Sequence, residues 1–358
     1  MSNYIEYNDT IAFHPGYYIK EIINESGLTQ EDFAKRLNTT AKNLSVIING
    51  EQSLSVDIAM KLSKMLGTSI NYWLNLQTAF DTVKAKIDAE GELEDERRIF
   101  KILDYKYFRE NCGLSALPRK TDEQIIELRK FLNIASLKVL TKRDLAANFR
   151  SAKDERDEAS IVRANAMLQI AINKALAIEA PRFDKRKFET AVDYALTLTT
   201  DHTGFYPKIK EAFYDAGVIL IIMPNLSGSK TNGATKRIGN NIMLMVNDRR
   251  LNADSFWFTL FHVIGHIINN DYGVSFENET GEQEKRAERY AENALIPPEE
   301  YKAFVASNEF DVVSIKRFAE RINRDPGIVI GRLANDKYVR FDDWSLKTLQ
   351  HKYKIQVK

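Results

Sequence analysis

The sequence contains a single cysteine, Cys112, and little proline or glycine, with 8 and 16 residues in a chain of 358. One cysteine excludes a disulfide framework and a zinc finger built on cysteine ligands. The longest apolar run, Gly217–Met223, has the length of a strand and falls well short of the ~18 residues that cross a membrane. The N-terminus through Asp9 is polar and acidic, unlike a signal or transit peptide. We therefore expect a cytoplasmic protein that does not associate with a membrane.

Neither charge is in excess. The chain has 51 Lys and Arg residues and 50 Asp and Glu residues, a formal net charge of +1. Such a chain does not attract nucleic acid as a whole, so any DNA binding must come from a local element. Hydrophobic residues make up 44% of the chain, which is typical of globular proteins and excludes disorder over most of its length.

The pattern of apolar residues predicts a mainly α chain, α+β overall. We expect an N-terminal domain of five short helices, a helical middle region, and a C-terminal α+β domain with a small sheet formed by β-branched runs at 217–223 and 241–246. An acid-rich segment, 88–98, is interpreted as a solvated hinge or helix start, and 353–357 as a final strand. The four expected parts are residues 1–80, 81–200, 201–300 and a small α+β appendage at 301–358.

Helix start and stop signals are clearest between residues 14 and 76. Pro15 opens a helix that Gly27 ends, and Thr29 caps the next one. Asn38 lies in the break before a helix at about 41–48, and asparagine tolerates the left-handed backbone that such turns require. This spacing is typical of a helix-turn-helix whose second helix enters the DNA major groove. A helical bundle that binds no DNA is the alternative.

Small polar side chains near the start of that second helix are the candidates for contacts with base edges, and Gln30, at the start of the first helix, can meet a phosphate. Residues 1–68 hold eight acidic and six basic side chains, so we expect weak, salt-sensitive binding by a monomer and a homodimer on operator DNA. The candidate DNA-binding residues are Gln30, Lys35, Thr40, Lys42, Asn43, Ser45 and Asn49.

Three stretches of this N-terminal part resemble the HigA-type antitoxins of the Xre helix-turn-helix family: Phe13–Glu21, Gly27–Ala34 and Ile47–Gly50. The resemblance implies a protein that represses its own operon. It also implies a partner, a small RelE/HigB-like toxin that cleaves messenger RNA.

Two of the five histidines, His262 and His266, are four residues apart and therefore share one helix face. This is the ligand spacing of zinc peptidases, in which a glutamate after the first histidine is the general base. Val263 occupies that position here and cannot accept a proton. By helical periodicity Glu284 faces inward on the next helix, so it is the candidate third zinc ligand. Alternatively, both histidines are hydrogen-bonded core residues and Glu284 is a surface charge.

Stretches around these residues resemble the ImmA/IrrE metallopeptidase-like family. The resemblance implies a zincin-like fold in which His262, His266 and Glu284 hold zinc, although that family has glutamate where this chain has Val263. Long antitoxins that fuse a HigA-like head to such a domain form a recognisable group. The similar stretches are Ser229–Arg237, Phe256–His266 and Glu284–Pro297, with further likeness at Ala147–Ala152, Ala159–Ala164 and Arg321–Leu333.

Three hypotheses for function follow. The first is an antitoxin and DNA-binding autorepressor of a type II toxin-antitoxin system, with an inactive peptidase-like domain as a toxin-binding or sensing scaffold. The second is a stand-alone transcription factor of the phage-repressor kind. The third is an active zinc endopeptidase, which needs a base other than Val263. We favour the first and expect no enzyme activity and no catalytic residue.

Overall fold

The computed structural model describes residues 3–142, 157–247, 252–276 and 281–353. The chain forms two compact units, Met1–Asp95 and Glu96–Lys358. It is mainly helical with one small sheet in each unit, which confirms the expected fold class. The finer division into four parts stays a prediction. None of the helices within the described ranges combines the length and apolar character needed to cross a membrane.

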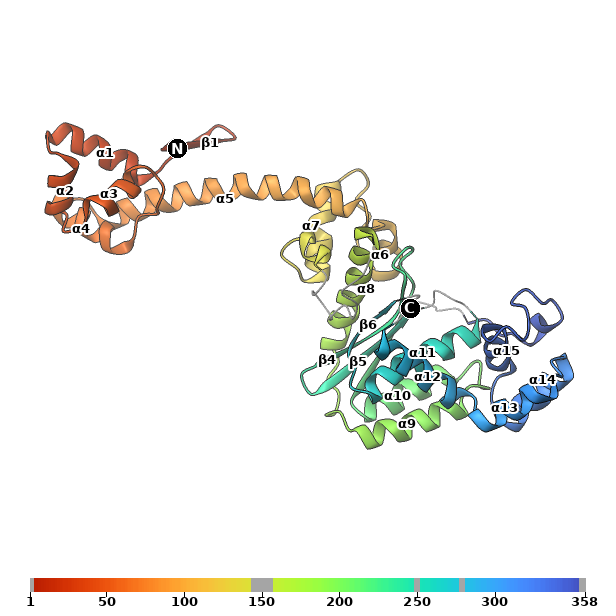
Figure 1. The fold of residues 1–358 in the computed structure, drawn as a ribbon. Helices are drawn as coiled ribbons and strands as arrows, with labels where there is room; N and C mark the ends of the chain where they lie inside the picture. The colour runs from red at the N-terminus through yellow and green to blue at the C-terminus, as the bar shows by residue number, and fades with distance from the viewer. Residues whose placement is uncertain (1–2, 143–156, 248–251, 277–280, 354–358) are drawn as a thin grey trace. The chain divides into compact units, whose positions relative to one another are not determined.

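Five helices build the first unit as the sequence predicted: α1 (Pro15–Ser26), α2 (Gln30–Arg36), α3 (Ala41–Ile48), α4 (Val56–Leu66) and the start of α5 (Ile70–Phe100) (Figure 1). Gly27 ends α1 with a φ of 67°, and the hydroxyl of Thr29 accepts the N–H of Asp32 at 3.1 Å. Asn38, between α2 and α3, has a φ of 50°. The start and stop signals therefore act as the sequence indicated.

One buried apolar cluster holds these helices together. Phe33, Leu44 and Trp73 are fully buried and come from α2, α3 and α5. Close approach of α1 to α3 depends on Gly16, because a Cβ at this position would lie 2.1 Å from the backbone oxygen of Ile47.

An N-terminal hairpin, absent from the sequence analysis, precedes the helices. Strands β1 (Tyr4–Tyr7) and β2 (Thr10–Phe13) pair antiparallel across a two-residue turn at Asn8 and Asp9, whose φ angles are 43° and 60°. Two consecutive positive φ angles are the geometry of a tight hairpin turn. Ala12 of β2 packs with Phe80 and Val83 of α5, which anchors the hairpin.

Segment 88–98 does not start a helix, because α5 runs unbroken from Ile70 to Phe100, although the boundary between the two units, after Asp95, falls within it. Glutamate is a good helix former, and one glycine, Gly91, weakens a helix without ending it. The hydroxyl of Tyr7 also donates to Glu90 at 2.7 Å and supports this stretch.

The second unit begins with helices α6 (Tyr105–Cys112), α7 (Thr121–Leu132) and α8 (Glu158–Leu176) and a 3₁₀ turn, η1 (Leu137–Thr141). The last residues of α5 belong to this unit, where the buried carboxylate of Glu96 accepts the N–H of Leu137 at 2.6 Å. The likeness noted at Ala147–Ala152 lies outside the described residues.

A four-stranded mixed sheet forms the centre of the second unit in the order β3-β5-β4-β6. Strand β3 (Val218–Met223) is parallel to β5 (Asn241–Asn247), which is antiparallel to β4 (Thr231–Ile238), itself antiparallel to β6 (Gly273–Phe276). The sequence predicted β3 and β5 and missed β4 and β6.

Helices cover the sheet. Helix α11 (Ala253–Ile268) packs against β4 and β5 on the face that carries Gly233 and Val246, and α8 contacts β3, β4 and β5. Alternate residues of β5, such as Met243 and Met245, are buried on the opposite face. Helix α12 (Glu282–Leu295) packs along α11 (Figure 1).

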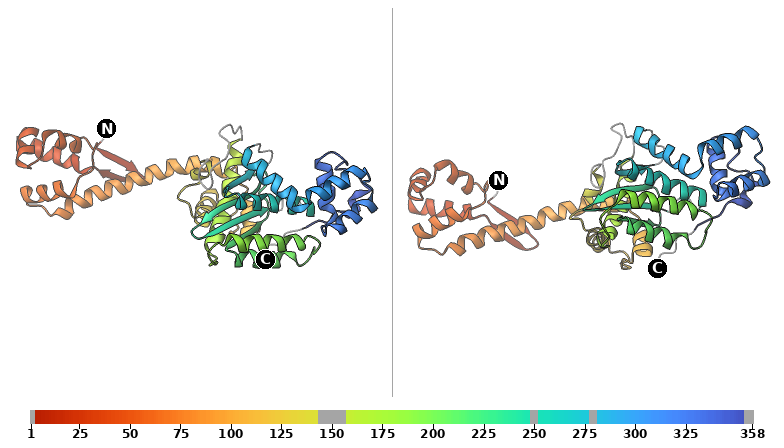
Figure 2. Two further views of the ribbon diagram at one scale, coloured as in Figure 1. Left: turned by 60° about the horizontal axis from the view of Figure 1, so that its bottom comes forward. Right: turned by 90° about the horizontal axis from the view of Figure 1, so that it is seen from below.

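The remaining helices of this unit are α9 (Lys185–Thr197), α10 (Phe205–Asp215), α13 (Pro298–Ser307), α14 (Val312–Arg321), α15 (Pro326–Asn335) and a 3₁₀ turn, η2 (Leu346–Leu349). Helices α13, α14 and α15 gather at one end of the unit (blue in Figure 2). In this C-terminal part, the described residues contribute a single β-bridge, Asn252 with Lys352. The predicted final strand, apart from Tyr353, lies outside the described residues.

Candidate functional site

Helix α3 presents the residues predicted to read DNA at its start. Thr40 is its N-cap, and the Thr40 hydroxyl accepts the N–H of Asn43 at 3.0 Å. The side-chain amide of Asn43 donates to the hydroxyl of Thr39 at 2.9 Å, which fixes its direction. Lys42 is exposed and Ser45 half-buried, so the first two turns of α3 carry polar groups while the opposite face packs in the core.

Other predicted DNA-binding residues flank this surface. Asn49 is exposed at the end of α3, and Gln30 is exposed at the first position of α2. The ammonium group of Lys35 lies 2.9 Å from the carboxylate of Glu31, and this hydrogen bond raises the pKa of Lys35. Because both partners are exposed, the pair contributes little to stability, and Lys35 can exchange Glu31 for a phosphate at small cost.

The second site lies between α11 and α12, where the structure brings His262, His266 and Glu284 together. The two Nε2 atoms are 3.2 Å apart. One oxygen of Glu284 lies 2.9 Å from His262 Nε2, and the other lies 3.3 Å from His266 Nε2. All three side chains therefore point at one another from two neighbouring helices.

These distances suit a tetrahedral metal ion. Ligand atoms bound to zinc at ~2.0–2.2 Å in a tetrahedron stand about 3.3 Å apart, close to the separations found here. Two imidazole nitrogens facing each other at 3.2 Å can share only one proton, and a cation between them would satisfy both lone pairs. The residues present therefore fit Zn²⁺, which the sequence suggested.

Glu284 is buried but remains ionised. Burial raises the pKa of its carboxyl group, yet the hydrogen bonds and charges of His262 and His266 outweigh this and keep the pKa well below its ordinary value. Ser275, a buried residue of β6, donates its hydroxyl to Glu284 at 2.9 Å and lies 2.9 Å from His262 Nε2. The sequence analysis missed Ser275, because β6 carries no signal that links it to the histidines.

Val263 is fully buried and faces the sheet. Its Cγ2 lies so close to Gly233 of β4 that a Cβ on that glycine would be 2.5 Å away. Where zinc peptidases carry their general base, this chain therefore has an apolar contact between α11 and β4. An active peptidase would have to recruit a base from elsewhere.

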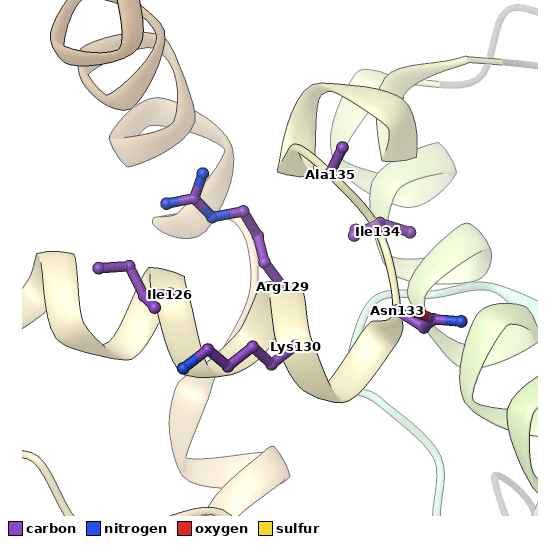
Figure 3. Close-up of a pocket in the computed structure, with 6 residues that line it drawn as sticks. All are labelled: Ile126, Arg129, Lys130, Asn133, Ile134 and Ala135. Carbon is purple, nitrogen blue, oxygen red and sulfur yellow. The ribbon is translucent and has the colours of Figure 1, made fainter. Parts of the chain in front are cut away.

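A shallow pocket lies on α7 and the segment that follows it (Figure 3). The guanidinium of Arg129 at this pocket is 3.5 Å from the buried carboxylate of Glu96. Its lining residues include no acid, histidine, serine or cysteine, so we assign no chemistry to it. The lining residues are Ile126, Arg129, Lys130, Asn133, Ile134 and Ala135.

Comparison with known proteins identifies the first unit. Residues 19–73 match the family model described as helix-turn-helix. Virulence-associated protein I of Dichelobacter nodosus is 30% identical over 85 residues, which are 24% of this chain and 79% of that protein. The HTH-type transcriptional regulator YddM of Escherichia coli is 32% identical over 72 residues, covering 20% of this chain and 77% of the relative.

Among solved structures, an addiction module antidote protein of a HigA family from Coxiella burnetii is 32% identical, covers 24% of this chain and 92% of its own, and has a TM-score of 0.22. The fold and surface of α1–α5 define a helix-turn-helix domain. The chain belongs to the helix-turn-helix family of transcriptional regulators.

Proposed function

We propose that this protein is the antitoxin and autorepressor of a type II toxin-antitoxin system. The observation that carries the proposal is the exposed polar start of α3 within a family-matched helix-turn-helix domain. The stretches that resemble HigA-type antitoxins, Phe13–Glu21, Gly27–Ala34 and Ile47–Gly50, all belong to that unit. Such a protein acts in the cytoplasm, where its operator is.

On this proposal α3 enters the major groove of the operator. Lys42 contacts a phosphate, and Asn43 and Ser45 face base edges, while Gln30 at the start of α2 meets the backbone. The first 68 residues carry more acids than bases, so one copy holds DNA weakly. Two copies on two half-sites supply the affinity that an operator complex needs.

The second unit is proposed as a peptidase-like scaffold that does not hydrolyse peptides. His262, His266 and Glu284 would hold Zn²⁺, and Ser275 would position Glu284. When bound, such an ion supplies positive charge that polarises an oxygen ligand, and it ties α11 to α12. With Val263 in place of the general base, an ion held by these residues would have a structural or sensing role.

Zinc binding can be tested with a matched pair of variants. Glu284→Gln removes the carboxylate charge between the histidines, and we expect at least a tenfold loss of Zn²⁺ affinity at this site by isothermal titration. Glu282→Gln removes the same charge from the same turn of α12 but is exposed, and should leave the affinity unchanged. Equal affinities in the two variants would argue against this ligand set.

The proposed toxin is a small basic ribonuclease, which an acidic surface would attract. Asp88, Glu90 and Glu92 are exposed on α5 and form one candidate surface. Their joint replacement, Asp88→Asn with Glu90→Gln and Glu92→Gln, should weaken toxin capture. Glu299→Gln with Glu309→Gln and Glu320→Gln removes three exposed charges from α13, α14 and the segment between them, and serves as the control.

The deciding experiment is capture of the tagged full chain from its native host, followed by mass spectrometry. A small basic protein at near-equal stoichiometry supports the antitoxin. DNA without such a protein overturns it and favours a stand-alone repressor of the phage type. The histidine cluster also leaves a zinc endopeptidase as an alternative, and hydrolysis by the unaltered chain that His262→Ala abolishes would establish it.

A further inference from the structure

A second cluster of metal-ligating side chains lies in the same unit, formed by His202, Asp325 and His351. His202 follows α9, Asp325 is the N-cap of α15, and His351 follows η2. Their ligand atoms all lie within 4.8 Å of one another. Four of the five histidines of the chain thus fall into two clusters, each with two imidazoles and one carboxylate.

Both imidazoles of this cluster address one oxygen of Asp325. His351 Nδ1 lies 2.8 Å and His202 Nε2 lies 3.2 Å from Asp325 Oδ2. The rings stack with centroids 3.7 Å apart. The other oxygen, Oδ1, accepts the N–H of Gly327 at 2.8 Å and caps α15. Oδ2 is therefore the atom of Asp325 directed at the histidines.

The charge of Asp325 needs compensation. Its side chain is 0% exposed, and the partners named above carry no charge unless an imidazole is protonated. Burying a carboxylate without a positive partner is costly, whereas a divalent cation supplies two charges and direct bonds. Two imidazoles with one carboxylate are a donor set that suits Zn²⁺ and its neighbours in the first transition row.

Hydrogen bonds around His202 orient its ring so that one nitrogen is available to a metal ion. Tyr353 Oη lies 3.2 Å from His202 Nδ1 and accepts the indole N–H of Trp257 at 3.1 Å. Hence His202 can offer Nε2 to a metal while Nδ1–H donates to Tyr353, the arrangement that orients metal-bound histidines. His351 is 46% exposed, so an ion can enter and water can complete its coordination.

We propose that His202, Asp325 and His351 form a second binding site for a divalent transition metal ion, separate from the cluster of His262, His266 and Glu284. The two sites lie near opposite ends of the same helix, α11. The N–H of Ala253, at the start of α11, donates to the backbone oxygen of His351, and Trp257 is one turn further along. His262 and His266 lie roughly 8–14 Å from Trp257 along the helix axis, at its other end.

A metal ion here would hold the C-terminal segment 351–353 onto the body. Without an ion, this segment is attached through the bridge of Asn252 with Lys352, the bond from Ala253, the hydrogen bonds of His351 and Tyr353 described above, and ring contacts of Tyr353 with Phe205 and Phe256. The site joins residues that are 123 and 26 positions apart in the sequence, and a bridge of this kind between distant segments restricts the unfolded chain most.

The test is Zn²⁺ titration of the metal-stripped full chain in variants that separate the sites. In His262→Ala/His266→Ala we expect one equivalent of Zn²⁺ to remain, and in the same background His351→Ala or Asp325→Asn should remove it. Asn keeps the cap on α15, and His351 is half-exposed, so both changes spare the fold. Lys352→Ala, an exposed neighbour, is the control and should keep that equivalent.

Binding of Co²⁺ gives an independent spectroscopic reading, because the intensity and position of its visible bands distinguish an ion coordinated by the protein from the hydrated ion in solution. The proposal is wrong if His262→Ala/His266→Ala takes up no Zn²⁺, or if His351→Ala and Lys352→Ala bind it equally. A different result is expected if the cluster of His262, His266 and Glu284 binds no metal. The unaltered chain would then bind one equivalent of Zn²⁺, His262→Ala/His266→Ala would still bind it, and His351→Ala would not.

Discussion

Lys42 and Asn43 are neighbours on the first turn of α3, but we expect them to act differently. Lys42 should contribute to the affinity for any DNA, and Asn43 to the preference for particular bases. Lys42 is an exposed point charge, and a contact from it to a phosphate does not depend on base sequence. Lys42→Ala should weaken binding to all DNA sequences alike and lower the salt slope of the affinity by about one. Affinity measured at several salt concentrations checks this. Lys64→Ala, at an exposed site near the end of α4, should change neither value.

Asn43 is expected to act on base choice. Its amide is held by the hydroxyl of Thr39, so it is oriented before DNA arrives. Asn43→Ala should relax preference at one base pair of each half-site, at a cost of about 1–3 kcal/mol on the preferred sequence. Selection from a random DNA pool measures this. Thr39→Ala frees the amide without removing it and should have a smaller effect, whereas an unchanged profile for Asn43→Ala would place the reading residues elsewhere.

The residues proposed to bind metal differ in how far the sequence could predict them. His262 and His266 were predictable because both lie on one helix, where a spacing of four residues fixes a shared face. Glu284 followed from the buried stripe of the next helix. Ser275 and the cluster of His202, Asp325 and His351 depend on tertiary packing of distant loops, and no local period reports such contacts.

At the scale of elements, two glycines in helices predict opposite effects of the same substitution. Gly16→Ala would place a Cβ 2.1 Å from the backbone oxygen of Ile47, so the backbone of α1 or α3 would have to move. We expect this substitution to destabilise the first unit by about 1–3 kcal/mol. Gly91→Ala on α5 meets nothing within 4 Å and should add ~0.5–1 kcal/mol to helix stability. Thermal unfolding of both variants checks the signs, and two losses would contradict the argument for Gly91.

Helices and strands with clear local start and stop signals could be predicted from the sequence. Proline, glycine and capping hydroxyls set the ends of α1–α4, and long apolar runs marked β3 and β5. The hairpin β1–β2 was missed because its strands are short and half-exposed. Strand β4 was missed because Thr231–Ile238 is polar and is held by its pairing with β5 and β6 rather than by its own hydrophobicity.

At the scale of the whole molecule, the net charge limits how strongly one copy of the chain can bind DNA. The net charge of +1 gives no long-range attraction to a polyanion, and the exposed cations of the first unit are few. Monomer affinity therefore rests on a handful of phosphate contacts and should fall steeply with salt. Two linked copies bind with a high effective concentration for the second half-site, which restores affinity at physiological salt.

This argument predicts two copies of the chain on an operator with half-sites about 10 base pairs apart, one turn of the double helix. Inserting five base pairs between the half-sites turns them to opposite sides of the DNA and should abolish the two-chain complex, while inserting ten should restore part of it. Gel-shift titration with sedimentation analysis counts the chains and measures the affinity. A one-chain complex that is indifferent to both insertions would rule out the dimer, and the domain would then have to hold its operator through contacts from a single copy.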